Sequence, residues 1–405
     1  MRIALFVETY FPFINGVVTH IKVLRDGLVQ LGHEVLIVTA DPSAKHHYIE
    51  DGVLHCPARA FKRLYGFGLA SPISHHRYEI IKEFNPDVLH MHQEFGVGLF
   101  CAKTAQKLNK PLVYTLHTMY DEYLFYVAPK VFLPAAKKIS HKYAGYLAKK
   151  AAAVTSPSAK AQDYFDKCKI NKSVKLIPNS VEMSKFDPAN FSDEQLKEIR
   201  KELGIRDGYS AAVFVGRMGK EKSVDALINN WAKCFTDEDK IHLVLIGDGP
   251  ELDALKQQAK DLGIADSVTF TGRVDHTKIA PYYAACDMYV SASLTEMMSI
   301  SMLEGLAAGL PVVQRYDEQN KGQYIEGVTG FTYKTTDEFG QIVKNLAHQT
   351  PEKKMKKKLE VRQSMKSKGE LQLAKYMLGV YSQVTGIKVD GLDDDITQDS
   401  VEASK

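Results

Sequence analysis

The chain alternates short apolar segments with longer amphipathic ones, and this alternation runs through the sequence twice. The first series contains "RIALFVE", "EVLIVT", "VLHMH" and "LVYTLH". After "FSDEQLKEIRKELGI" the second series contains "SAAVFVG", "IHLVLIGDG", "VTFTG" and "MYVSAS". Continuous apolar strands separated by helical segments are typical of a parallel sheet with helices on both faces. The sequence therefore predicts an α/β protein with two facing, doubly wound Rossmann-like domains and a ligand cleft between them.

The length agrees with two domains, because 405 residues exceed what one ordinary core accommodates. We expect a first domain over residues 1–190 and a second over residues 205–369. A helical pattern at about 370–386, "ELQLAKYMLGVYSQV", is expected to pack back on the first domain. The remainder, 387–405, is acidic and poor in aromatic residues, which predicts a disordered tail.

Charge and cysteine content exclude several classes of protein. A formal net charge of +3 argues against a nucleic-acid binder. The five cysteines are scattered and form no CxxC pair, which indicates reduced thiols rather than a disulfide framework or a zinc site. No apolar run reaches the roughly 18 residues that span a bilayer. The opening "MRIALFVETYFPF" enters a strand directly and has no small-residue cleavage site, so we expect a cytoplasmic protein without a signal peptide.

Two stretches of the second series carry charged residues at the ends of predicted strands. "VFVGRMGKEKSVDAL" places Gly216, Arg217 and Lys222 between a strand and a helix, which suits an anion. "SASLTEMMSISMLEGLAAGLPVV" places Glu296 and Glu304 in an apolar stretch without an obvious cationic partner. Taken alone, the two cations could be solvated loop residues. The two acids could be a helix cap and a hydrogen-bonded helix residue.

Together these residues resemble the donor site of the retaining glycosyltransferases of family 4, which have the GT-B fold. The pattern is a GR…EK loop, here "GRMGKEK", followed by E-x7-E, here Glu296 to Glu304. The resemblance extends over most of the chain, because "GHEVLIVT", "PDVLHMHQEF", "SPSAKAQDYF", "IPNSVEMSKF", "LIGDGPELDAL", "VTFTGRV" and "GLPVV" follow in the family's order.

The resemblance implies a role for each residue of the donor site. Arg217 and Lys222 would bind the pyrophosphate of a nucleotide sugar, and Glu304 the ribose hydroxyls. Glu296 would contact the transferred sugar. The backbone around Arg273 and Val274 would hold the base, and the amides of Met298, Ser299 and Ile300 would lie against the β-phosphate. Gly16 and Gly216 are two further predicted donor-binding residues.

No metal cofactor is expected, because fixed cations, backbone amides and a helix dipole can stabilise a departing diphosphate. The acidic triplets at Asp237–Asp239 and Asp393–Asp395 are interpreted as solvated surface. Ser299 stands where the family usually has glycine, and Ser180 does the same in "IPNSVE". A serine there still offers its backbone amide, but a left-handed backbone would cost it about 1 kcal/mol or more and would then affect donor geometry and activity.

The first domain should bind the acceptor. Asn15 and Gly16 form a predicted turn between the first strand and a helix, where glycine permits close backbone approach to a phosphate or sugar. His117 lies at the end of a predicted strand, where a hydroxyl of the donor sugar could meet it, and is a candidate catalytic residue. His90 and His92 are interpreted as structural.

"NGVVT" together with "HTMYDEY" resembles the branch of the family that makes α-glucosyl-diacylglycerol from UDP-glucose at bacterial membranes. Residues 123–162 and 52–78 contain no Asp or Glu but many cations with interleaved aromatic residues. Such segments suit an anionic lipid surface, although the longer one could also be an ordinary solvated helix. The predicted acceptor and membrane residues are Asn15, Gly16, Arg59, Lys62, Arg63, Lys137, Lys138 and Lys142.

The resemblance therefore implies a peripheral membrane enzyme at the inner face of the cell membrane. It would transfer glucose from UDP-glucose to diacylglycerol with retention, without a cofactor or a nucleic-acid partner. Two alternatives stay open. One is transfer to another acceptor, such as a phosphorylated inositol or a soluble sugar. The other is a non-catalytic relative that binds nucleotide sugar or stabilises a partner enzyme.

Overall fold

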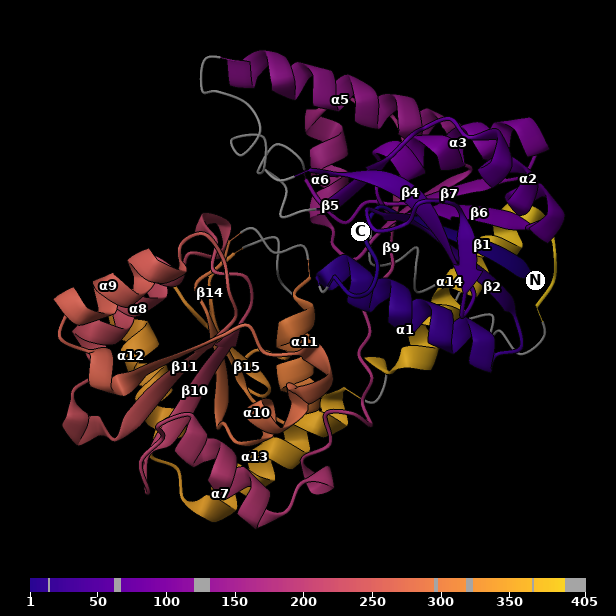
Figure 1. The fold of residues 1–405 in the computed structure, drawn as a ribbon. Coiled ribbons are helices and arrows are strands. Elements are labelled where there is room, and N and C mark those ends of the chain that lie inside the picture. The colour runs from indigo at the N-terminus through magenta and orange to yellow at the C-terminus, as the bar shows by residue number, and fades with distance from the viewer. Residues whose placement is uncertain are drawn as a thin grey trace. The chain divides into compact units, whose positions relative to one another are not determined.

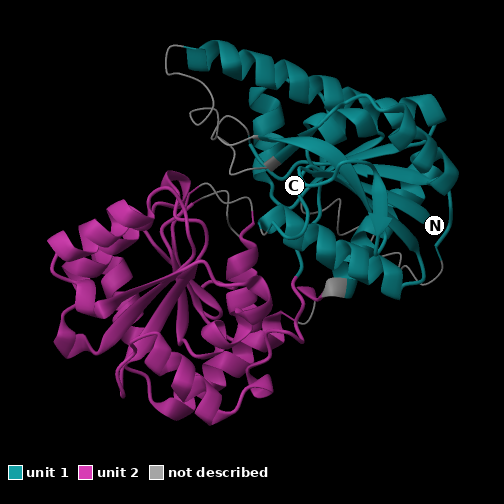
Figure 2. Cartoon of the chain, in the orientation of Figure 1, with its two compact units in different colours: residues 1–180, 370–405 teal, residues 181–369 magenta. Residues whose placement is uncertain are grey.

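The computed structural model describes residues 1–13, 15–61, 67–119, 132–294, 298–317, 323–365 and 368–389. The chain divides into two compact units, one of residues 1–180 with 370–405 and one of residues 181–369 (Figure 2). The division falls at Ser180, earlier than the 190–205 interval expected from the sequence. The reason is that α7 (Asp193–Glu202) belongs to the second unit and packs against its α10 (Ala280–Ala284).

The first unit contains a mostly parallel sheet whose strand order places β1 beside both β2 and β6. The order is β3 (Tyr48–Glu50), β4 (Val53–Phe61), β2 (Glu34–Asp41), β1 (Arg2–Val7), β6 (Val88–Met91), β7 (Leu112–Thr115), β8 (Ala153–Ser156) and β9 (Val174–Leu176). Strands β3 and β5 (Phe67–Ala70) pair with β4 in antiparallel fashion. The direction of strand order reverses between β1 and β6, which is where ligands bind in doubly wound sheets.

Helices cover both faces of this sheet because successive residues of β1 point to opposite sides. Leu5 faces α1 (Gly16–Gln30) and α14 (Glu370–Thr385), whereas Phe6 meets Phe100 of α3 (Gly96–Leu108). The helix expected at 370–386 is thus observed as α14, which lies along α1 in the first unit (Figure 1). The other helices of this unit are α2 (His75–Phe84), α5 (Leu133–Lys150) and α6 (Lys160–Lys167).

The second unit contains an entirely parallel sheet. Its order is β12 (Val268–Gly272), β11 (Ile241–Ile246), β10 (Ser210–Val215), β13 (Met288–Ser291), β14 (Val312–Arg315) and β15 (Gly330–Tyr333). All six residues of β11 are buried, which explains its unbroken apolar sequence. Here the strand order reverses between β10 and β13, so a ligand site is expected at their carboxyl ends.

Two separate cores lie on the two faces of this second sheet. Trp231 is fully buried in the core formed with α8 (Val224–Cys234), α9 (Leu252–Asp261) and α12 (Thr336–Ala347). On the other face α7, α10, α11 (Ile300–Ala307) and α13 (Pro351–Ser364) enclose residues such as Tyr283 and Leu303. Helix α7 begins with a capping box formed by Ser192 and Gln195.

All five cysteines are free thiols. Within the described ranges, no helix is long and apolar enough to cross a membrane. The acidic residues from 390 onward lie outside the described residues, so the predicted disorder of the tail stays a prediction.

Candidate functional site

In the second unit, the loops after β10 and β11 pack directly on each other at the carboxyl edge of the sheet. Gly247 follows β11 with a φ of +139°, and a Cβ there would lie 1.9 Å from the carbonyl oxygen of Gly216. Only glycine tolerates both this backbone conformation and this contact. The loop that carries Arg217 is therefore held against its neighbour by backbone contact.

A buried carboxylate fixes the cation of this loop. Arg217 donates to Glu221 Oε1 through Nε (3.0 Å) and Nη2 (2.5 Å), and the Glu221 side chain is only 2% exposed. A Cβ at Gly219 would lie 2.4 Å from Glu221 Oε2, so glycine is needed for the loop to close around the acid. The Arg217 side chain keeps 34% exposure, and a guanidinium has further N–H groups for an anion. Lys222 lies partly exposed in the adjoining 3-10 turn.

Glu221 is a site residue that the sequence analysis missed. The available signal was an acid inside a basic loop, four residues after Arg217. An i, i+4 spacing allows a pair, but the burial of the carboxylate is a property of the fold.

Strand β13 lies next to β10, where the strand order reverses, and it leads to α11. Ser299 caps the first turn of this helix. Its φ is −71° and its ψ is 115°, and its Oγ accepts a hydrogen bond from the Met302 amide at 3.3 Å. Ser299 is therefore not left-handed, and the cost considered for a left-handed serine does not arise. Ser180 is likewise absent from the non-glycine residues with positive φ. Met298 and Ile300 flank Ser299 and are each 8% exposed, whereas Glu296 lies outside the described residues.

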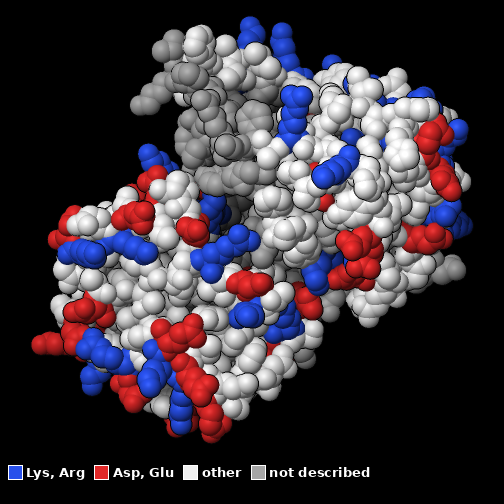
Figure 3. Space-filling model, in the orientation of Figure 1, with Lys and Arg blue, Asp and Glu red and all other residues white. Residues whose placement is uncertain are grey.

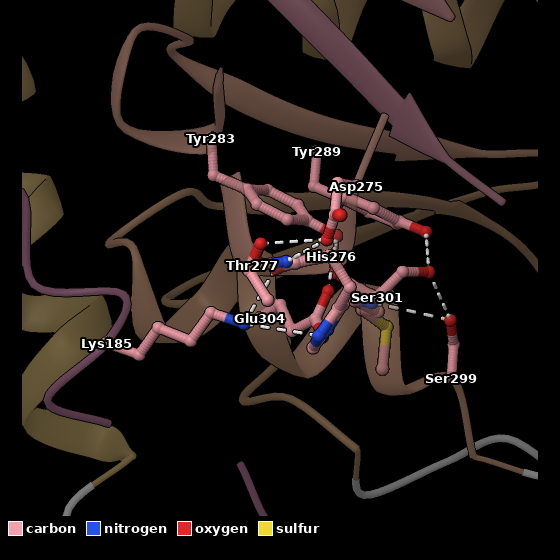
Figure 4. Close-up of polar contacts among 10 residues, drawn as sticks. Lys185, Asp275, His276, Thr277, Tyr283, Tyr289, Ser299, Ser301 and Glu304 are labelled. Atoms are coloured by element: carbon pink, nitrogen blue, oxygen red, sulfur yellow. Dashed lines mark hydrogen bonds and ion pairs between the residues drawn. The ribbon is translucent and has the colours of Figure 1, made fainter. Parts of the chain in front are cut away.

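Glu304, on α11, is 3% exposed and receives hydrogen bonds from two other elements (Figure 4). His276 Nε2 lies 2.7 Å from its Oε1, and the Tyr283 hydroxyl lies 2.9 Å from its Oε2. Burial and the nearby carboxylate raise the pKa of Tyr283 well above its usual value, so its hydroxyl stays protonated. Lys185 Nζ lies 3.1 Å from His276 Nδ1 and donates to the His276 carbonyl oxygen at 2.8 Å.

The hydrogen-bond partners of this acid thus come from segments remote in sequence, which the sequence analysis did not identify. The predicted base-binding residues lie in the loop between β12 and His276. Arg273 is exposed and Val274 is partly buried. The structure accordingly brings Gly216, Arg217, Lys222, Arg273, Val274, Met298, Ser299, Ile300 and Glu304 to the carboxyl edge of one sheet.

In the first unit the corresponding edge is formed by α1 and by residues that follow β1, β6 and β7. Asn15 caps α1 through a hydrogen bond from the Val18 amide to its Oδ1 (3.0 Å) and donates to Thr9 Oγ1 (3.3 Å). Gly16 begins the helix and is exposed. The Val18 amide is therefore occupied by the cap, and the amides of Gly16 and Val17 are those that a ligand at this helix start would meet first.

Four histidines, His20, His90, His92 and His117, gather at this edge and are called the histidine cluster below. His92 Nδ1 lies 3.0 Å from His117 Nε2, and His20 Nδ1 lies 2.8 Å from Asn179 Oδ1. Burial lowers the pKa of His20 to about 4 and lowers the pKa values of the other three well below the usual value. The cluster is therefore uncharged at neutral pH.

His90 has the structural role that the sequence suggested. Its Nδ1 lies 2.7 Å from the Tyr381 hydroxyl of α14, and its Nε2 lies 2.6 Å from Thr115 Oγ1 of β7. His92, in contrast, contacts His117 directly, so its role is not confined to the core. His117 itself is only partly buried and lies at the open side of the cluster.

Two buried carboxyl groups lie beside the cluster's strands. Glu8 follows β1 and accepts hydrogen bonds from the amides of Val97 (2.6 Å) and Gly98 (3.1 Å) at the start of α3. Glu94 follows β6 and accepts one from the Tyr114 hydroxyl at 2.7 Å. Burial raises the pKa of Glu8 to about 7 and that of Glu94 to about 8.

His20, His92 and His117 are the one group among the described residues with the makings of a metal site, since one nitrogen of each lies within 4.8 Å of the others. A zinc ion with bonds of about 2.0–2.1 Å would bring three such nitrogens to roughly 3.3 Å from one another. The cluster would have to contract, and the His92–His117 hydrogen bond would have to break. Asp237 instead pairs with Arg206, and Asp239 with Lys344 at 2.8 Å, while Asp393–Asp395 lie outside the described residues.

The basic helix predicted to meet a membrane is α5. Its Ala144, Leu147 and Ala148 are buried, and the Tyr143 hydroxyl donates to the Glu94 carbonyl oxygen. Lys137, Lys138 and Lys142 are exposed, as are Ile139 (68%) and Tyr146 (45%). Lysine side chains are visible over α5 at the top of Figure 3. Arg59 is exposed on β4, whereas Lys62 and Arg63 lie outside the described residues.

Comparison with known families gives two matches that together cover most of the chain. A model described as glycosyl transferases group 1 matches residues 195–368, and one described as glycosyltransferase family 4 matches residues 14–185. A Streptococcus pneumoniae protein named alpha-monoglucosyldiacylglycerol synthase is 35% identical over 77% of this chain and 70% of its own length. An Acholeplasma laidlawii protein of the same name is 32% identical over 87% of this chain and 89% of its own length.

Solved structures share the fold. Anabaena Alr3699/HepE, crystallised with UDP and glucose, has a TM-score of 0.71 and 19% identity, covering 95% of this chain and 100% of its own. Sucrose-phosphate synthase from Thermosynechococcus elongatus has a TM-score of 0.70 and 18% identity, covering 95% and 99%. The GT-B fold predicted from the sequence is thus confirmed. With both family models and the two relatives above, this chain belongs to glycosyltransferase family 4 and is a hexosyltransferase.

Proposed function

We propose that the protein transfers glucose from UDP-glucose to diacylglycerol with retention, while bound peripherally to the inner face of the cell membrane. The observation that carries this choice of acceptor is the name shared by the two relatives that are 35% and 32% identical, alpha-monoglucosyldiacylglycerol synthase. The second of these matches spans 87% of the chain, so it includes both units.

The carboxyl edge of the second unit supports the nucleotide half of this proposal. Arg217 and Lys222 would bind the pyrophosphate, and the amides of Met298, Ser299 and Ile300 would receive the β-phosphate at the start of α11. Glu304 would accept the ribose hydroxyls. The loop with Arg273 and Val274 would hold the base, Gly216 would admit the backbone close to the phosphates, and Glu296 would contact the sugar.

The reaction breaks the bond between C1 of glucose and the β-phosphate oxygen and forms a bond between C1 and the acceptor oxygen on the same face. The acceptor hydroxyl loses its proton to the departing phosphate, so protons and charge balance. Arg217, Lys222 and the helix amides stabilise the charge that develops on the diphosphate. We therefore also propose that no metal is required, and that chelators leave turnover unchanged.

In the first unit, Gly16 and the start of α1 would approach the donor phosphate or sugar. His117 would hold a sugar hydroxyl as a neutral imidazole, since burial lowers its pKa well below the usual value. A neutral imidazole can donate from one nitrogen and accept at the other, which suits an uncharged hydroxyl. Asn15 fixes this region by capping α1.

The exposed side of α5 supports the membrane half of the proposal. Ile139 and Tyr146 are exposed next to Lys137, Lys138 and Lys142, and the helix contains no acid. Exposed apolar side chains among lysines are typical of helices that lie in the interface of an anionic membrane. Phe95 (48% exposed) follows Glu94, whose carbonyl oxygen accepts a hydrogen bond from the Tyr143 hydroxyl of α5.

The decisive experiment supplies labelled UDP-glucose to the purified protein with anionic vesicles that contain diacylglycerol, and counts label in the organic phase. Label there supports the proposed reaction. UDP release without lipid label would point to another acceptor, such as a phosphorylated inositol or a soluble sugar. No UDP release with any sugar or acceptor would support a non-catalytic relative.

Vesicle sedimentation tests the membrane surface separately. Replacing Lys138 and Lys142 by glutamine should weaken binding to phosphatidylglycerol vesicles roughly thirtyfold, because each lysine contributes about 1 kcal/mol near anionic headgroups. The matched control replaces Lys353 and Lys356, two exposed lysines of α13, and should bind as wild type. Equal loss in both variants would reduce the effect to net charge and contradict a specific surface.

A further inference from the structure

The carboxylate of Glu304 is held from two sides before any ligand is present. His276, in a short 3-10 helix (His276–Lys278), contacts its Oε1 at 2.7 Å, and Tyr283, on α10, contacts its Oε2 at 2.9 Å (Figure 4). A carboxylate has about four acceptor positions, so one remains on each oxygen after these two contacts. Those two positions could receive a pair of neighbouring hydroxyl groups.

Lys185 determines which nitrogen of His276 carries the proton. Its ammonium lies 3.1 Å from His276 Nδ1 and donates to the His276 carbonyl oxygen at 2.8 Å. An ammonium has donors but no acceptor, so Nδ1 must accept and the ring proton resides on Nε2, pointing at Glu304. A hydrogen-bonded chain therefore runs from Lys185 through the imidazole to the carboxylate.

This series of hydrogen bonds joins three segments of the second unit that are distant in sequence. Lys185 precedes the 3-10 helix at Pro188–Asn190, and His276 and Glu304 follow 91 and 119 residues later. The side chain of Glu304 is 4% exposed and that of His276 is 17% exposed. A carboxylate so removed from water needs charged or polar partners, and it cannot reorient while these hold it.

We propose that Lys185 and His276 are positioning residues that hold Glu304 for the 2′- and 3′-hydroxyls of the nucleotide, and so set a preference for ribonucleotides over deoxyribonucleotides. The inference rests on the proposed function, in which Glu304 receives the ribose. If Lys185 and His276 instead only stabilise the buried Glu304 carboxylate, replacing either residue would weaken the binding of ribonucleotides and deoxyribonucleotides equally.

The test measures dissociation constants of UDP and 2′-deoxy-UDP by calorimetry with the full chain. Wild type should favour UDP by about tenfold or more, since a hydroxyl bound to a charged acceptor is lost in the deoxy compound. His276→Leu should shrink this ratio to within about threefold while changing the affinity for 2′-deoxy-UDP little. His276→Gln retains a donor near the Nε2 position and should restore most of the ratio.

Lys185→Met should reduce the ratio as well, and it carries the test if His276→Leu does not fold. The matched control is Lys278→Met, which removes an exposed cation of the same 3-10 helix and should leave the ratio as in wild type. Suppose that His276→Leu and Lys185→Met keep the wild-type preference for UDP over 2′-deoxy-UDP, while Glu304→Gln loses it. That result would overturn the roles of Lys185 and His276 but not the proposed donor site. A wild-type ratio in Glu304→Gln, or no binding of UDP by wild type, would overturn the proposed donor site with it.

Discussion

The two units have the same strand-order reversal but place opposite kinds of chemistry beside it. In the second unit the edge is charged, with the Arg217–Glu221 pair, Lys222, and the chain from Lys185 to Glu304. In the first unit the edge carries the histidine cluster, which burial keeps uncharged. The two units thus share a fold but differ in the chemistry of their edges, because the loops and not the sheet determine that chemistry.

The difference fits the two halves of a glycosyl transfer. A nucleoside diphosphate is anionic and needs cations held in place, whereas a sugar or lipid hydroxyl is neutral and needs hydrogen bonds without charge. Burial of a cation is costly unless it is paired, and Glu221 meets that need for Arg217. Neutral imidazoles avoid the same cost in the first unit.

Removing Lys222, the partly exposed lysine of the loop after β10, should have the largest effect. Lys222→Ala should lower turnover by about two to three orders of magnitude, because preorganised donors to a developing anion contribute that much. Initial rates of UDP release would measure it. Lys220→Ala, an exposed lysine of the same 3-10 turn, is the control and should stay near wild type.

Near-normal turnover in Lys222→Ala would contradict the proposal that Lys222 binds the pyrophosphate. It would also weaken the contrast between a charged edge in the second unit and an uncharged edge in the first. A circular dichroism spectrum like that of wild type is required, so that loss of turnover is not loss of fold.

Acid should destabilise the first unit more than the second. Because burial lowers the folded-state pKa of His20 to about 4, the unfolded chain binds more protons below pH 6.5, and the free energy of unfolding falls as pH falls. His20 alone should lose about 2 kcal/mol between pH 6.5 and 5. Glu8 and Glu94 act in the opposite direction there, since their raised pKa values let the folded chain take up protons, but they are two groups against four histidines.

The chain has one tryptophan, Trp231, in the core of the second unit, so its fluorescence reports on that unit, while circular dichroism reports on both. The second unit has a buried histidine of its own, His242, whose pKa burial also lowers to about 4. Guanidinium unfolding at pH 7 and pH 5 should therefore show a larger shift by circular dichroism than by fluorescence. Equal shifts would contradict the contrast between the units.

These results separate what the sequence could predict from what it could not. Strand periodicity predicted both sheets, since an apolar run such as β11 follows directly from burial on two faces. The motifs predicted Arg217 and Lys222, which follow β10, and Glu304, which lies in α11. The partners of Glu304 are His276 and Tyr283, 28 and 21 residues away, and Lys185 contacts His276 from 91 residues away. No local sequence pattern predicts that these residues come together.

Ser299 teaches the same lesson in the opposite direction. The cost considered for serine depended on a left-handed backbone, whereas the residue has a φ of −71° and caps a helix. Serine is among the favoured residues at a helix N-cap, a role that comparison with a glycine position did not suggest.

His117→Ala should lower kcat/KM for UDP-glucose by about tenfold, a smaller effect than at Lys222, because a hydrogen bond between neutral groups is weaker than one to an anion. Since burial keeps the imidazole neutral, the pH profiles of wild type and variant between pH 6 and 8 should have the same shape. An acid limb near pH 6.5 that disappears in the variant would show that His117 changes charge during turnover and would break the comparison.

The smallest effect is expected from Ser299→Gly. This variant tests whether the start of α11 acts through its backbone amides rather than through the serine side chain. The Ser299 side chain accepts a hydrogen bond from the Met302 amide at 3.3 Å, and glycine in place of a serine cap costs only a few tenths of a kcal/mol. The backbone amide that we propose receives the β-phosphate remains in the variant. Turnover should therefore stay within about twofold of wild type, with a slightly lower unfolding midpoint. A tenfold or greater loss of turnover would mean that the Ser299 hydroxyl itself contacts the donor. The proposed phosphate site would then include this side chain as well as the backbone amides.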